Sequence, residues 1–189
     1  VAANWVLLPA NARKRNDVVT AQQAQLEDAA VNSTYNIYIE GHDKSLGILT
    51  SGIGFNYVNE CFPGGSPYPI LKISQYPLPK KLVRRLMEEC DQVLIVEEGQ
   101  PFIEDMVRGV SEIASSGEHG MTRDKDETLE SPCRSVAIHG KLDGTLPRTG
   151  ELTPDAVKQA LGLLFPEASV VSEAQEAPAV PAIVAARPP

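Results

Sequence analysis

The chain has 189 residues and is acidic, since 25 Asp and Glu residues against 17 Lys and Arg residues give a formal net charge of −8. This balance argues against nucleic acid and against an anionic membrane surface as partners, because both are negatively charged. A hydrophobic fraction of 42% with only 5% aromatic residues predicts one domain with a mostly aliphatic core and some length left for tails.

The N-terminal region, residues 1–34, contains the segment NWVLLP, followed by a polar stretch of modest helical character at 17–30. A small basic cluster, Arg13, Lys14 and Arg15, lies in this region without interleaved aromatic residues. We interpret that cluster as a solvated surface patch.

Between residues 36 and 165, short apolar runs alternate with amphipathic segments. The runs predict strands at 36–39, 45–50, 68–74, 91–96 and 135–138. Strands that alternate with helices of ten or more residues indicate βαβ units and a largely parallel sheet. The runs are apolar throughout, which is typical of strands covered on both faces.

Four amphipathic segments predict the helices that alternate with these strands. Ser51 is expected to cap the first, Pro79 suits the first turn of the second, and Thr153 caps the last with Pro154 at its first position. The third helix is expected at 100–114. The residues expected on the inward faces are Ile53, Tyr57, Val58 and Cys61; Leu82, Val83, Leu86 and Met87; Phe102, Ile103, Met106, Val107 and Val110; and Val157, Ala160, Leu161 and Leu164.

Two segments fall outside the alternating pattern. Residues 117–133 are polar and charged and are interpreted as a surface excursion. From about residue 168 the chain consists of Ala, Pro, Glu and Val without periodicity, which is typical of a linker.

The metal-binding and nucleophilic residue types are few and dispersed. The cysteines are Cys61, Cys90 and Cys133, and the histidines are His42, His119 and His139. Without a C-x-x-C pair there is no sign of a zinc knuckle or a ferredoxin-type cluster, and free buried thiols in a reducing cytosol are expected. The histidines lack metal-ligand spacing and no G-x-S-x-G elbow is present, so neither a metal site nor a nucleophile-and-base enzyme is predicted.

Two glycine-containing segments deserve comparison with cofactor motifs. In SGIGFNYV (51–58), Gly52 and Gly54 follow a strand and open a helix, but the third glycine of a dinucleotide fingerprint is missing. This segment is either a tight turn without a ligand or, through its backbone N–H groups, an anion site.

In HGKLDGTLP (139–147), Asp143 and its glycine are similar to the start of the thiamine diphosphate and magnesium motif. Because Leu142 replaces a motif glycine and no asparagine follows Asn59, we interpret this segment as a turn.

Glu97 and Glu98 stand where the run at 91–96 ends, and three interpretations are open. Ligands collect at the carboxyl ends of parallel strands, where paired carboxylates could share a proton and act in catalysis. Alternatively, acids favour a helix N-terminus, and Glu98 followed by Gly99 and Pro101 is such an approach. The third interpretation is a contact with another domain or subunit.

Four segments in order carry a family resemblance: SLGILTSG, YPLPKKL, VLIVEEGQPFIE and GELTPDAVKQAL. Together they resemble the alpha subunit of indolepyruvate:ferredoxin oxidoreductase, and their skeleton is similar to the transketolase C-terminal domain of many thiamine diphosphate enzymes. NWVLLPANARKR resembles the segment by which that subunit leaves its pyrimidine-binding domain. The resemblance covers residues 5–164.

The resemblance implies a three-layer α/β fold like the transketolase C-terminal domain. Its mostly parallel five-stranded sheet would have helices on both faces and one antiparallel strand at an edge. Residues 1–34 would be a linker or helical segment from a preceding domain, 35–166 the α/β domain, and 167–189 an Ala/Pro-rich linker to a cofactor-binding domain. The chain is therefore expected to be a fragment of a longer protein. A cytoplasmic location is expected because the sequence shows no targeting signal or membrane span.

The family's enzymes oxidatively decarboxylate aryl 2-oxoacids to acyl-CoA with thiamine diphosphate, magnesium, coenzyme A, iron–sulfur clusters and ferredoxin. The resemblance implies that this chain is a non-catalytic assembly domain, inactive alone, whose partners are its own chain's other domains and a beta subunit. The sequence departs from the family pattern in two respects. Its excursion at 117–133 is longer, and it lacks the cluster cysteines and the pyrophosphate-binding domain. No catalytic, cofactor or metal residue is carried over to it.

Two other functions stay open. One is a small-ligand module that binds coenzyme A or a nucleotide at the strand ends through Ser51, Gly52 and Gly54. The other is a complete small enzyme that uses Glu97 and Glu98.

Overall fold

The computed structural model describes residues 6, 8–115 and 136–165, with side chains described up to residue 109 in the second of these ranges. The segment 117–133, with His119 and Cys133, and the linker 167–189 therefore lie outside the described residues. Within the described part, no helix is both long enough and apolar enough to cross a membrane.

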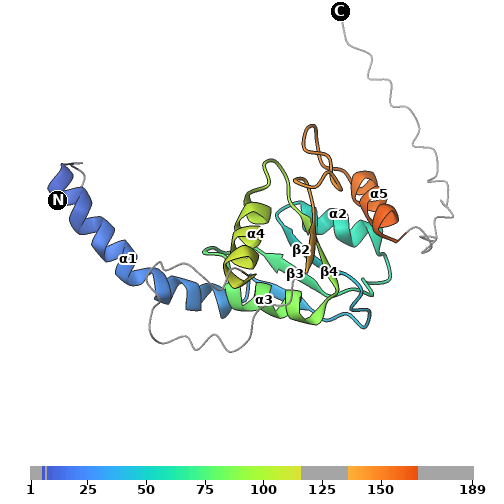
Figure 1. The fold of residues 1–189 in the computed structure, drawn as a ribbon, viewed down its shortest axis with the longest axis horizontal. Helices are drawn as coiled ribbons and strands as arrows, with labels where there is room; N and C mark the ends of the chain where they lie inside the picture. Colours follow the sequence, from blue (N-terminus) through green and yellow to red (C-terminus); the bar gives the residue numbers. More distant parts are fainter. Residues whose placement is uncertain (1–5, 7, 116–135, 166–189) are drawn as a thin grey trace, which may run out of the picture.

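The described strands form one mixed sheet in the order β1-β3-β2-β4-β5 (Figure 1). They are β1 (Ile37–Ile39), β2 (Gly47–Ser51), β3 (Ile70–Ile73), β4 (Gln92–Val96) and β5 (Ala137–His139). β1 pairs antiparallel with β3, and the remaining pairs are parallel. The expected five-stranded, mostly parallel sheet with an antiparallel edge strand is thus confirmed, with strand ends that differ from the sequence prediction by at most two residues.

Helices cover both faces of this sheet (Figure 1). α3 (Lys80–Glu89) and α4 (Phe102–Ser115) pack on one face, and α2 (Gly54–Cys61) and α5 (Pro154–Leu164) pack on the other. Alternate residues of β4 divide between the two layers, since Val93 and Ile95 face α3 and α4 whereas Leu94 and Val96 face α2 and α5. The three-layer α/β arrangement is therefore present.

Most of the residues predicted to face inward do so and two do not, while the side chain of Val110 lies outside the described residues. Ile53 is 41% exposed and directly precedes α2, and Phe102 is 59% exposed and is the first residue of α4. The residues confirmed as buried are Val58, Cys61, Val83, Leu86, Met87, Ile103, Val107, Val157, Ala160 and Leu161, while Tyr57, Leu82, Met106 and Leu164 are partly buried.

The predicted helix caps have mixed outcomes. The Thr153 hydroxyl accepts a hydrogen bond from the Ala156 N–H at 3.2 Å, so Thr153 caps α5 as predicted, with Pro154 as its first residue. Ser51 does not cap α2, because a turn intervenes and the helix begins only at Gly54. Pro79 directly precedes the first residue of α3.

α1 (Pro9–Val31) is longer than the helical stretch predicted at 17–30, and its N-terminal half projects from the domain (Figure 1). It is polar on all sides, and Ala30 is its one buried residue among those described. Asn36 fixes the C-terminal end of α1: its amide donates to the Ala30 and Gln75 carbonyls and accepts from the Ser74 and Gln75 N–H groups. α1 is therefore anchored through its last turn.

Candidate functional site

The carboxyl ends of β2, β3, β4 and β5 meet at one edge of the sheet, because these strands are parallel. This is the edge at which open α/β sheets bind ligands. All five candidate residues from the sequence lie there: Ser51 ends β2, Gly52 and Gly54 follow it, and Glu97 and Glu98 follow β4.

Glu97 is buried and serves the start of α4. Its side chain is only 4% exposed, and its two oxygens accept hydrogen bonds from the N–H groups of Ile103 at 2.8 Å and Glu104 at 2.9 Å. Those N–H groups have no partner within the helix, so the carboxylate satisfies them. Burial raises the pKa of the Glu97 carboxyl, the nearby Glu104 charge raises it further, and the two backbone donors oppose the rise.

Glu98 is exposed and does not share this environment. The strand alternation explains the difference: Glu97 continues the row of Val93 and Ile95 toward α4, and Glu98 points the other way. The sequence suggested Glu98 as the acid at the helix start, whereas Glu97 occupies that position.

A second buried carboxylate, Glu104, was not singled out from the sequence. It is 1% exposed and accepts hydrogen bonds from the Lys141 N–H at 2.7 Å and the Leu142 N–H at 3.2 Å. The Arg108 guanidinium donates to it at 2.7 Å and also to the Ile138 carbonyl at 2.8 Å. The spacing from Glu104 to Arg108 is the one local sign that could have revealed the ion pair.

Lys141 completes this buried network. It is 4% exposed, and its ammonium donates to the Gly99 carbonyl at 2.5 Å. The loop after β4, the first turns of α4 and the loop after β5 are therefore tied together by charged groups that already have partners. Such an arrangement can hold these three segments in place, whereas proton transfer to a ligand would require displacing a structural hydrogen bond.

The turn between β2 and α2 is closed by its own backbone. The Phe55 N–H donates to the Gly52 carbonyl at 3.4 Å, and the Asn56 and Tyr57 N–H groups donate to the Ile53 carbonyl at 2.9 and 3.3 Å. Gly52 has a positive φ of 55°, which favours glycine.

Gly54 is required for a different reason, which is space. A Cβ at this position would lie 2.7 Å from the Val96 carbonyl oxygen and 3.0 Å from the Thr50 hydroxyl. The two glycines thus have structural roles, a left-handed turn and a close helix–strand approach.

Asp143 organises the turn after β5. Its carboxylate accepts from the N–H groups of Gly140 and Thr145, each at 3.0 Å, and lies 2.8 Å from the His139 Nδ1. Burial opposes ionisation of Asp143, but these hydrogen bonds outweigh it and lower its pKa to about 2. The Asp-Gly pair is therefore part of a hydrogen-bonded turn, as the sequence indicated.

The described cysteines do not belong to a cluster of potential metal ligands. Cys61 and Cys90 are buried free thiols, and burial raises the pKa of Cys90 to about 11. The described residues contain no group of three or more His, Cys, Asp and Glu side chains placed to hold a metal ion.

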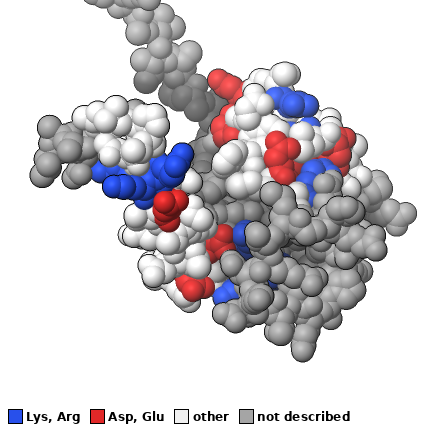
Figure 2. All heavy atoms as spheres, turned by 60° about the vertical axis from the view of Figure 1, so that its left-hand side comes forward, with Lys and Arg blue, Asp and Glu red and all other residues white. Residues whose placement is uncertain are grey.

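The outer surface of the strand edge carries aromatic side chains. Tyr76 follows β3 and Phe102 begins α4, and their rings lie 6.1 Å apart although the two side chains are 47% and 59% exposed. On the face drawn in Figure 2, basic and acidic side chains of the described residues are interspersed. A pair of exposed aromatic rings in mutual contact is typical of a protein contact.

The chain is similar to curated proteins of one name. It is 33% identical over 172 residues to indolepyruvate oxidoreductase subunit IorA of Methanothermobacter thermautotrophicus, a match that covers 89% of this chain and 25% of the relative. It is 30% identical over 170 residues to IorA of Thermococcus kodakarensis, covering 86% of this chain and 23% of the relative. IorA of Archaeoglobus fulgidus is 33% identical over 112 residues, a match that covers 57% of this chain and 18% of the relative.

No protein-family model and no solved structure matches the chain. The chain spans about a quarter of the length of the first two of these curated relatives. It is therefore a distant homologue of indolepyruvate oxidoreductase subunit IorA that corresponds to part of that subunit.

Proposed function

We propose that this chain is a non-catalytic assembly domain of an indolepyruvate:ferredoxin oxidoreductase alpha subunit. The observation that carries the proposal is the internal use of the strand-edge carboxylates. Glu97 and Glu104 are buried and hydrogen-bonded to backbone N–H groups of the same domain, so they stabilise loops where an α/β enzyme would present catalytic groups.

In this proposal residues 35–166 form a domain like the C-terminal domain of transketolase. Residues 1–34 lead from a preceding domain, and 167–189 lead to a cofactor-binding domain. The parent enzyme would oxidatively decarboxylate aryl 2-oxoacids to acyl-CoA, pass electrons to ferredoxin and pair with a beta subunit.

The described residues do not fit the parent enzyme's thiamine diphosphate and magnesium. The Asp143 oxygens are taken by Gly140, Thr145 and His139, and the described residues contain no group of three or more His, Cys, Asp and Glu side chains that could hold a metal ion. Thiamine diphosphate, magnesium, coenzyme A and the iron–sulfur clusters would therefore be held by other parts of the parent enzyme.

The surface proposed for assembly is the exposed aromatic pair, Tyr76 and Phe102, together with Glu98. Its occupant would be another domain of the alpha subunit or the beta subunit. Burying two aromatic rings against a neighbour is favourable, whereas exposed rings at the strand edge have no evident use in an isolated domain.

Ligand binding is tested by calorimetric titration of the chain with thiamine diphosphate and magnesium, and then with coenzyme A. We expect no saturable heat in either titration. Thiamine diphosphate binding that is lost in Asp143→Asn would contradict the turn interpretation. Coenzyme A binding that protects residues 51–54 from hydrogen exchange would favour the small-ligand module.

Assembly is tested in a full-length alpha subunit that carries this sequence. Phe102→Asp should weaken association with the beta subunit or loosen domain packing without lowering the melting temperature of the α/β domain. Leu163→Asp is the matched control, because Leu163 is a similarly exposed apolar residue on α5. Glu98→Gln should leave turnover unchanged, and a large loss of turnover would instead favour the enzyme that uses the paired glutamates.

A further inference from the structure

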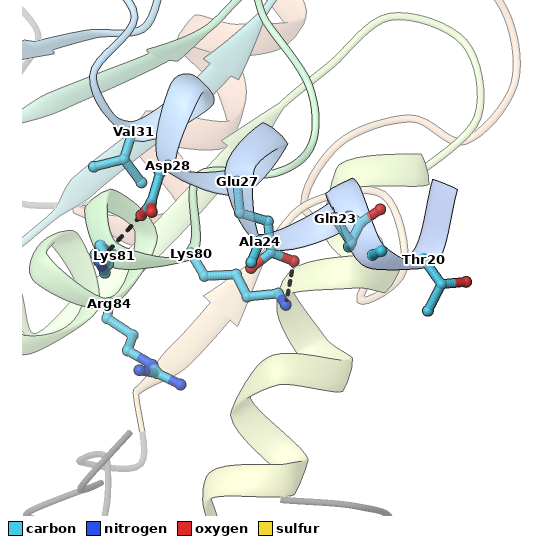
Figure 3. A pocket seen from close by; sticks show the side chains of 10 residues that line it. Thr20, Gln23, Ala24, Glu27, Asp28, Val31, Lys80, Lys81 and Arg84 are labelled. Atoms are coloured by element: carbon cyan, nitrogen blue, oxygen red, sulfur yellow. Dashed lines mark hydrogen bonds and ion pairs between the residues drawn. The ribbon is translucent and has the colours of Figure 1, made fainter. Parts of the chain in front are cut away.

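A groove of about 710 Å³ lies between the C-terminal half of α1 and the start of α3 (Figure 3). α1 contributes residues from Thr20 to Val31, and α3 contributes Lys80, Lys81 and Arg84. None of the site residues described above lines the groove. Its volume falls in the range of small-molecule sites.

The α3 side of the groove concentrates positive charge at a helix N-terminus. Lys80 and Lys81 are the first two residues of α3, and its first turn contains no acidic residue. The helix dipole favours anions at this end and disfavours cations. The local sequence therefore works against the helix unless negative charge is supplied from elsewhere.

α1 supplies part of that negative charge. The Lys80 ammonium lies 2.9 Å from the Glu27 carboxylate, and the Lys81 ammonium lies 3.5 Å from that of Asp28 (Figure 3). Two carboxylates face three cationic side chains in the groove, so one positive charge is left over.

That charge belongs to Arg84. Its Nε is buried and has no hydrogen-bond partner, the single such side-chain nitrogen or oxygen among the described residues. A guanidinium offers five N–H donors in a fixed plane, and a buried donor without an acceptor is unfavourable. The neighbouring Arg85 is the contrast, since it donates to both Glu40 and Glu89.

We propose that this groove binds a phosphate monoester with a polar, non-aromatic body, and that the Arg84 guanidinium is its main contact. A phosphate offers several acceptor oxygens and close to two negative charges. It could therefore accept from Arg84 and from the N–H donors that Lys80 and Lys81 do not use for their ion pairs. The groove is much larger than a phosphate, and its other lining residues, such as Thr20, Gln23 and Ala24, offer small or polar surface but no aromatic ring.

The first test is titration of the chain with inorganic phosphate and with glycerol 3-phosphate, followed by calorimetry and by the NMR signal of the Arg84 Nε–H. We expect saturable binding of both, with tighter binding of glycerol 3-phosphate and a shift of the Arg84 signal. Arg84→Ala should weaken binding at least about tenfold, which is the effect of losing one charge-assisted contact. Arg13→Ala removes the same charge from an exposed position of α1 outside the groove and should have little effect.

A second variant gives a change of opposite sign. Glu27→Gln frees Lys80 from its carboxylate and should strengthen phosphate binding several-fold, whereas a groove with a purely structural role would not respond in this way. Circular dichroism checks that α1 remains helical in both variants.

Three results would overturn the proposal: no saturable phosphate binding, binding that Arg84→Ala leaves intact, or equal losses in Arg84→Ala and Arg13→Ala. Binding of an acidic peptide in the absence of phosphate binding would also overturn it and would assign the groove to a protein partner. Tighter binding of adenosine monophosphate than of glycerol 3-phosphate would contradict the non-aromatic body.

Discussion

Gly140→Ala tests the buried network around Glu104 most directly. A Cβ at position 140 would lie 2.4 Å from the Glu104 Oε2 and 2.7 Å from its Cδ. Gly140 is not among the positive-φ glycines, so an alanine meets a steric conflict at this position and no conformational one. The added methyl group must displace a carboxylate that is 1% exposed and holds Lys141, Leu142 and Arg108.

The expected cost has two parts. Forcing a methyl group into a filled site costs about 1–3 kcal/mol. Moving the carboxylate leaves buried N–H donors without an acceptor, which costs about 1–3 kcal/mol more. We therefore expect the free energy of unfolding to fall by roughly 2–6 kcal/mol, and the melting temperature to fall by roughly 5–25 °C.

Urea unfolding of four proteins separates the steric conflict from other effects: wild type, Gly140→Ala, Glu104→Ala and the double variant. Because Glu104→Ala removes the opposing carboxylate, Gly140→Ala should cost at least about 2 kcal/mol less in that background. Gly162→Ala is the control, since a Cβ there meets nothing within 4 Å and should stabilise α5 by about 0.5–1 kcal/mol. Equal costs of Gly140→Ala in both backgrounds would refute the reasoning.

Three further predictions concern the caps and turns around the site. Thr153→Ala should lower the free energy of unfolding by about 1 kcal/mol through loss of the α5 cap, and Thr153→Ser should restore most of it. Asp143 has a folded-state pKa of about 2, below its ordinary 3.8. The stability that its ionised carboxylate contributes should therefore be fully present above about pH 5 and be lost as the pH falls toward 2. In unfolding measured across this pH range, Asp143→Asn should lose less stability than the wild type. Gly54→Ala should cost about 1–3 kcal/mol in thermal unfolding, because its methyl group would meet the backbone carbonyl of Val96, which cannot move independently of β4.

Local patterns were sufficient to predict the layers of the fold. Apolar spacing located α3 and α5, because burial of one helix face is a short-range property of the sequence. The Thr153-Pro154 pair predicted the start of α5, since both its cap and its first turn lie within four residues.

Predictions failed where the chain adds a turn or where the partner is distant. Ser51 is two residues too early to cap α2, because Gly52 and Ile53 form a turn first. Phe102 has the right spacing for the buried stripe of α4 but is the first residue of that helix and remains 59% exposed. The role of Glu97 could have been found by extending the alternation of Val93 and Ile95 by two residues.

The Glu104 network had no such local sign beyond its spacing to Arg108. Its acceptor lies in α4, and its donors at Lys141 and Leu142 lie 37 and 38 residues later in the chain. Only the order of β4 and β5 in the sheet brings these groups together. A single sequence does not specify that order, so the buried charges at the strand edge could not be inferred from it.

The strand edge and the groove at α1 differ in one respect that bears on function. At the strand edge the buried charged groups have partners within the domain, so only outer side chains such as Tyr76, Phe102 and Glu98 remain for a neighbour. In the groove, by contrast, the Arg84 Nε–H donor is buried without an acceptor. A surface whose polar groups are satisfied suits contact through shape and apolar area, whereas an unsatisfied cation suits a charged ligand. We therefore expect changes at Phe102 to alter assembly and changes at Arg84 to alter ligand binding, each without the other effect.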